Sequence, residues 1–131
     1  MKGRKLSNQQ DKLDRISRLQ GSIAQLESYL SFFESQGKQA PLSCWVARYQ
    51  VKQRDKVYWY YKLQASVPLF AQKHNKSFSK YQHLGKSGSI SHVEAVMAVT
   101  RRTIVTELQK SIDSLKGALL DIAFDGEQES L

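Results

Sequence analysis

The chain has 131 residues and a formal net charge of +8, with 40% hydrophobic and 24% charged residues. This composition is typical of a folded globular protein and excludes an intrinsically disordered chain. No apolar stretch is long enough to cross a bilayer, and the N-terminus lacks the apolar segment of a secretory signal. The single Cys44 cannot form an internal disulfide, which agrees with a reducing compartment. We therefore expect a cytoplasmic protein that folds as a single domain over residues 1–131.

Most of the positive charge lies in the middle of the chain. Residues 37–92 contain ten Lys and Arg residues and a single acidic residue, Asp55, so their net charge is +9. The segment before them has a net charge of +2, and the segment after them has a net charge of −3. Because a surface that serves only solubility mixes both signs, this concentration favours binding to a polyanion.

The first predicted element is a long amphipathic helix over residues 7–36. Ser7 and Gln10 fit a capping box at its start. Apolar residues recur every three or four positions, which is the period of a helix with one buried face. These residues are Leu13, Ile16, Leu19, Ile23, Leu26, Leu30 and Phe33.

Two segments that are rich in β-branched and aromatic residues follow at 44–52 and 57–63. The four residues between them predict a turn, so the two segments should form an antiparallel hairpin. We expect the register that pairs Tyr49 with Trp59, because it gathers the apolar side chains on one face. The core face would then hold Trp45, Tyr49, Val51, Val57, Trp59, Tyr61 and Leu63, and the outer face would hold Arg48, Gln50, Lys52, Tyr58, Tyr60 and Lys62.

The remaining elements complete the predicted fold. A third strand is expected at 77–84, at the end of a basic aromatic sheet region that spans 44–86. A second long amphipathic helix over 91–123 starts with a capping box at Ser91, and an acidic tail covers 124–131. The fold class is therefore α+β: a long N-terminal helix, a small antiparallel sheet of two or three strands, and a long C-terminal helix packed on the first. The two helices could pair within one chain or through a homodimer, and both arrangements remain open.

The outer face of the hairpin is the candidate binding surface. Cations bind phosphates, tyrosine rings stack on exposed bases, and a two-stranded ribbon fits the major groove of duplex DNA. The candidate nucleic-acid contacts are Arg48, Gln50, Lys52, Arg54, Lys56, Tyr58, Tyr60, Lys62, Lys80 and Lys86. The alternative interpretation is an ordinary solvated sheet face, on which Lys and Tyr are also common.

Catalytic and metal chemistry have almost no candidates in this sequence. Asp55 is the one acid of the middle segment, so paired carboxylates for general acid–base catalysis are missing there. His74, His83 and His92 have no zinc-ligand spacing with Cys44. We expect no enzymatic activity, no cofactor and no metal.

The segment Lys80-Tyr81-Gln82-His83-Leu84-Gly85-Lys86 follows the aromatic hairpin. In this combination residues 44–110 resemble a family of small basic bacterial proteins of cyanobacterial type, for which no activity is established. The order strand, strand, strand, helix is also similar to the arm-type DNA-binding domains of tyrosine integrases. That resemblance implies DNA contacts by Arg48, Gln50, Tyr58, Tyr60 and Lys62, although a shared fold does not fix a function.

We therefore expect an accessory or regulatory protein that binds nucleic acid through a basic, tyrosine-rich hairpin. Duplex DNA is favoured over RNA as the partner, and no membrane association is expected. The alternative is a helical protein–protein interaction or assembly factor that docks on an acidic partner.

Overall fold

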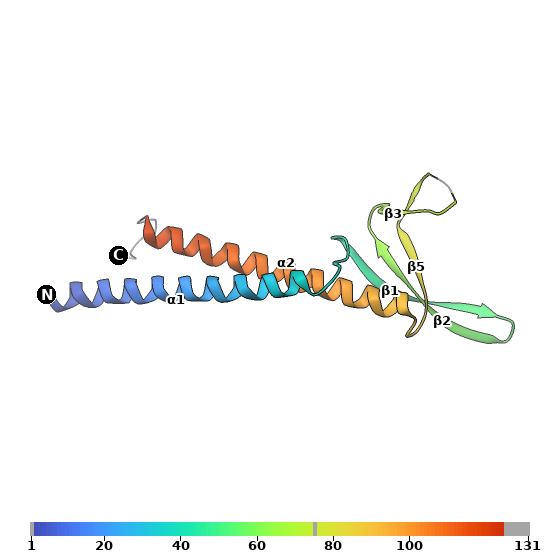
Figure 1. The fold of residues 1–131 in the computed structure, drawn as a ribbon, viewed down its shortest axis with the longest axis horizontal. Helices are drawn as coiled ribbons and strands as arrows, with labels where there is room; N and C mark the ends of the chain where they lie inside the picture. The colour runs from blue at the N-terminus through green and yellow to red at the C-terminus, as the bar shows by residue number, and fades with distance from the viewer. Residues whose placement is uncertain (1, 75, 125–131) are drawn as a thin grey trace. The chain divides into compact units, whose positions relative to one another are not determined.

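The computed structural model describes residues 2–74 and 76–124, with side chains from residue 7 onward (Figure 1). Two long helices and two small antiparallel sheets confirm the α+β class. The helices are α1 (Lys2–Ser35) and α2 (Ile90–Ala123), and the strands are β1 (Cys44–Gln53), β2 (Lys56–Ala65), β3 (Phe70–Ala71), β4 (Phe78–Ser79) and β5 (Tyr81–Lys86). The chain divides into two compact units: a helical unit, Met1–Ser35 with Val105–Leu131, and a sheet unit, Gln36–Ile104. The predicted acidic tail lies outside the described residues except for Phe124.

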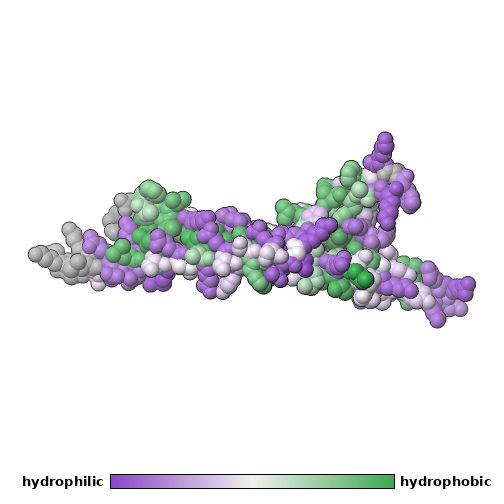
Figure 2. Space-filling view, viewed as in Figure 1, coloured by the Kyte–Doolittle hydropathy of each residue, from purple (hydrophilic) through white to green (hydrophobic). Residues whose placement is uncertain are grey.

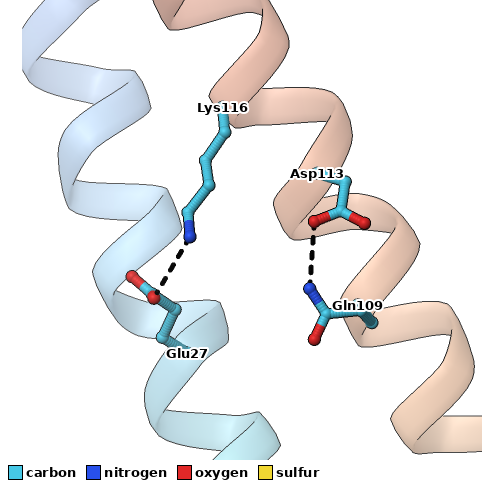
Figure 3. Close-up of polar contacts among 4 residues, drawn as sticks. All are labelled: Glu27, Gln109, Asp113 and Lys116. Carbon is cyan, nitrogen blue, oxygen red and sulfur yellow. Dashed lines mark hydrogen bonds and ion pairs between the residues drawn. The ribbon is translucent and has the colours of Figure 1, made fainter.

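In the helical unit, α1 packs against the C-terminal half of α2 through the predicted apolar stripes. Ile23, Ile112 and Ile122 are its buried apolar residues within the described part of the chain, so this core is thin. The carboxylate of Glu27 lies 3.6 Å from the ammonium group of Lys116, and this ion pair links the two helices (Figure 3). Over the described residues, neither helix has an apolar stretch sufficient for a bilayer span.

The main sheet of the sheet unit has the strand order β1-β2-β5, with both pairs antiparallel. β1 and β2 pair along their full length, whereas β5 pairs only with residues 60–64 of β2. The rest of the hairpin extends beyond β5 (Figure 1), and we call residues 50–59 the hairpin arm. The predicted third strand at 77–84 is divided between β4, which pairs with β3 in a second sheet, and β5.

The register of β1 and β2 differs by one residue from the expected one. Tyr49 pairs with Tyr60 rather than with Trp59. The turn consists of the two residues Arg54 and Asp55, an even number, and Arg54 adopts a φ of 57°. A slip of one residue moves every side chain of a strand to the opposite face of the sheet. The predicted faces were therefore right for β2, whose Tyr61 and Leu63 face the core, and wrong for β1.

The core of the sheet unit lies between one side of the main sheet and α2. Its buried residues are Ala40, Cys44, Leu63, Ala65, Phe70, Leu84 and Ala95, with Val46, Tyr61, Ala98 and Val99 packed against them. Burial concentrates near the base of the hairpin, so the hairpin arm contributes little to this core. We call the side of the sheet that faces α2 the helix side, and the opposite side the outer face.

Helix α2 starts at Ile90, and Ser89 is its N-cap. The Ser89 hydroxyl accepts the His92 N–H at 3.2 Å and donates to the carbonyl of Leu84 at 2.9 Å. This arrangement satisfies a free N–H group of the first turn and ties the helix start to β5. The predicted start at Ser91 was therefore placed too late in the sequence.

The segment between α1 and β1 is fastened to α2 by backbone contacts. The N–H of Ala40 donates to the carbonyl of Ala98 at 3.1 Å, and the Arg101 guanidinium donates to the carbonyl of Lys38 at 2.8 Å. Gly37 permits this approach, because a Cβ atom at that position would lie 2.8 Å from the Arg101 Cζ atom.

Candidate nucleic-acid interface

Aromatic and basic side chains gather on the outer face of the three-stranded sheet. Because side chains alternate along a strand, every second residue of β1 and β2 points away from α2, and their β5 partners Tyr81, His83 and Lys86 point the same way. The resulting set contains Trp45, Tyr49, Tyr58, Tyr60, Lys62, Tyr81, His83 and Lys86. None of the residues in these three strands is acidic, so no carboxylate neutralises the cations within the set.

Lys62 stands at the centre of this face. Its ammonium group lies 4.3 Å from the centroid of the Tyr81 ring and 5.1 Å from the centroid of the Tyr49 ring. The Tyr49 and Tyr60 rings lie 6.1 Å apart with their planes tilted by 30°. Cation–π contacts of this kind hold the ammonium group beside the rings without cancelling its charge.

His83 and Lys86 extend the same face along β5. The Nδ1 atom of His83 lies 3.0 Å from the Tyr49 hydroxyl, which forms a hydrogen bond across the sheet. The ammonium group of Lys86 lies 5.6 Å from the centroid of the Tyr58 ring. The outer face therefore carries a network of rings and cations around Lys62 and a further cation–ring pair, Lys86 and Tyr58.

The side chains of the outer face remain accessible to solvent. Trp45 and Tyr81 have 43% and 42% of their surface exposed, and both are large hydrophobic residues. His83 and Lys86 are exposed, while Tyr58, Tyr60 and Lys62 are half-buried by their neighbours. A ligand can reach the network without displacing any helix of the sheet unit.

The hairpin arm forms a second basic feature. Its exposed tip carries Lys52, Arg54 and Lys56, with Asp55 as the single acid. Figure 2 shows hydrophilic side chains at the tip of the β1–β2 hairpin and along the loop between β3 and β4. The tip therefore presents a net positive charge at the end of a two-stranded ribbon.

The structure brings together only part of the predicted contact set. The outer face holds four of the predicted contacts: Tyr58, Tyr60, Lys62 and Lys86. The helix side holds three others: Arg48, Gln50 and Lys52. Of the rest, Arg54 lies in the turn, Lys56 at the end of the arm and Lys80 between β4 and β5. Arg48 places its guanidinium 3.9 Å from the ring centroid of Trp59 on the helix side. The sequence predicted one contact surface. The structure instead divides these residues between the outer face and a hairpin arm whose cations point to both sides of the sheet.

Sequence reasoning missed Tyr49, Tyr81 and His83. Tyr49 was assigned to the core because the expected register placed it opposite Trp59, and the even two-residue turn reverses that assignment. The feature that would have placed Tyr49 correctly is the turn length, because a turn of two residues puts Tyr49 on the same face as Tyr60.

No family model, curated protein or solved structure matches the chain. Among the residues that the structure describes, no group of His, Cys, Asp and Glu side chains could hold a metal ion.

Proposed function

We propose that the protein binds nucleic acid, DNA in preference to RNA, as an accessory or regulatory factor. The observation that supports this most directly is the outer face, where Lys62 lies between the rings of Tyr49 and Tyr81 on strands without acidic residues. Ammonium groups bind phosphate oxygens, and aromatic rings stack on bases or pack against sugars. We assign binding rather than catalysis, because the cations and rings of this face suit contacts with phosphates and bases.

The hairpin arm supports the preference for DNA. It is a two-stranded ribbon that extends beyond the third strand and carries basic residues at its tip. The major groove of B-form DNA admits such a ribbon, whereas the major groove of A-form RNA is too narrow. Cations on both sides of the ribbon, such as Lys52 and Lys56, would then lie near the phosphates of both groove walls.

The test is a fluorescence anisotropy titration of labelled duplex DNA and duplex RNA at several salt concentrations. We expect tighter binding to DNA, and an affinity that falls with salt as counterions are released, with a log–log slope of about −0.9 for each phosphate contact. An affinity that does not change with ionic strength would contradict the proposal.

A second candidate function is assembly through the helical unit, with a second copy of this chain as the partner. It is favoured by the thin core of that unit, in which Leu13 and Leu120 remain 60% and 57% exposed. Two packed helices bury only a narrow part of each apolar stripe, and a second pair of helices would cover more of it. Light scattering of the full chain decides this: a dimer mass supports assembly, and a monomer mass at all concentrations excludes it.

A further inference from the structure

A cavity of about 610 Å³ lies beside the outer face in the sheet unit. Its wall combines the end of β3 and the following loop with Ser79 of β4, residues of β5 and Ser91 of α2. Lys73 and His74 supply cationic or hydrogen-bonding groups, Gln72 and Gln82 supply amides, and Tyr81 supplies an aromatic ring. No carboxylate is found among the described residues that line it.

The cavity is continuous with the outer face, because two residues belong to both. Tyr81 lines the cavity and also contacts the ammonium group of Lys62 at 4.3 Å. His83 lines the cavity and is hydrogen-bonded to Tyr49 at 3.0 Å. A chain that lies on the outer face can therefore reach the cavity along β5.

The size and lining of the cavity match one nucleotide. Small-molecule sites typically span about 300–1,000 Å³ and combine apolar walls with a few placed polar groups. A ring such as that of Tyr81 offers a stacking surface, amides such as that of Gln72 pair with base edges, and Lys73 offers a donor for a phosphate. A base inside a duplex is stacked and paired, so only an unpaired nucleotide could occupy this space.

We propose that this cavity takes one unpaired nucleotide of the DNA that is bound on the outer face, so that DNA with a single-stranded segment is the preferred substrate. The inference rests on the proposed function and adds to it the class of substrate. The duplex would contact the hairpin arm, and the strand that leaves the duplex would cross the Tyr49–Lys62–Tyr81 cluster into the cavity.

The experiment uses the full chain and two labelled DNAs, a blunt duplex and the same duplex with a short thymidine overhang. We expect the overhang DNA to bind at least about fivefold more tightly, as one stacked base would give. In the double variant Lys73→Gln and His74→Gln the preference for the overhang DNA should decrease, because the cavity loses the cation that contacts the phosphate. The matched control is Lys76→Gln, which removes the same formal charge from the same loop but does not line the cavity. It should keep the preference.

The outcomes separate this inference from the proposed function. Equal binding of both DNAs by the wild-type protein, or an unchanged preference in the double variant, overturns the cavity assignment while salt-dependent duplex binding still stands. Absence of binding to either DNA overturns the proposed function itself. Circular dichroism of both variants checks that the exposed loop substitutions leave the fold intact.

Discussion

The imidazole ring of His92 stacks on the phenol ring of Tyr61, with ring centroids 3.8 Å apart and planes 22° from parallel. This contact joins the first turn of α2 to the centre of β2, on the helix side of the sheet. The Nδ1 atom of His92 also accepts the N–H of Gly88 at 3.0 Å, so one side chain links the sheet, the helix and the loop before the helix.

Two substitutions of His92 should separate the contribution of the ring stack to stability from that of the hydrogen bond. His92→Phe keeps an aromatic ring against Tyr61 and leaves the exposed Gly88 N–H to water, so we expect a loss of less than about 1 kcal/mol in unfolding free energy. His92→Ala removes both contacts and should cost about 2 kcal/mol. Urea denaturation of the two variants measures the difference, and equal losses would show that the stack contributes nothing.

Arg102 should be a main anchor of the segment that enters β1. Its guanidinium donates to the carbonyls of Pro41 and Cys44, both at 2.7 Å. Arg102→Ala should lower the unfolding free energy by about 2 kcal/mol, because two hydrogen bonds from a charged donor are lost, one of them to the half-buried carbonyl of Cys44. Arg101→Ala is the matched control and should cost less, because Arg101 donates to one exposed carbonyl, that of Lys38. A larger loss for Arg101→Ala would contradict this account.

The hairpin turn should be strained at Arg54. Its φ of 57° lies in the left-handed region, which glycine adopts without a Cβ clash. Arg54→Gly should therefore raise the unfolding free energy by up to about 1 kcal/mol, while Arg54→Ala should give no gain. If both variants change stability equally in thermal or urea unfolding, the strain is absent. The glycine variant should still bind DNA more weakly, since it lacks one cation of the arm tip.

Removal of the two outer-face cations should weaken DNA binding without unfolding the protein. The double variant Lys62→Gln and Lys86→Gln should reduce the magnitude of the salt-dependence slope by about two, because two phosphate contacts are lost. Lys110→Gln with Lys116→Gln removes the same charge from the helical unit, and Gln at 116 can still hydrogen-bond to Glu27. Equal effects of the two pairs in anisotropy titrations would mean that only net charge matters.

The helices and the fold class could be predicted because their signal is repeated many times. Each apolar residue at an interval of three or four positions adds to the same helical period, so an error at one position does not change the result. The ends of the helices are less certain, because one hydroxyl decides where a helix starts. Ser89 and Ser91 are equally good capping residues by type, and only the contacts of Ser89 with His92 and Leu84 distinguish them.

The faces of the hairpin could not be predicted because they depend on a single turn. The expected register would hold if both strands were half-buried along their length, but burial holds only near Cys44 and Leu63 at the base. In the arm no core selects a register, so Trp59 and Val57 remain 40% and 48% exposed on the side that was expected to be core. The core also uses small residues such as Ala65, which a search for large apolar side chains overlooks.

The bulge between β2 and β5 determines which way Lys86 points. Tyr61 pairs with Gly85 and Lys62 pairs with His83, so Leu84 is an extra residue in β5 without a partner of its own. In a strand without this insertion, Lys86 would share a side with Leu84 and face the core. The insertion shifts the alternation by one step, which lets a single strand supply both a buried leucine and an outward lysine. The length of β5, and not only its composition, thus determines the proposed binding surface, and a one-residue deletion there would exchange the inside and the outside of its end.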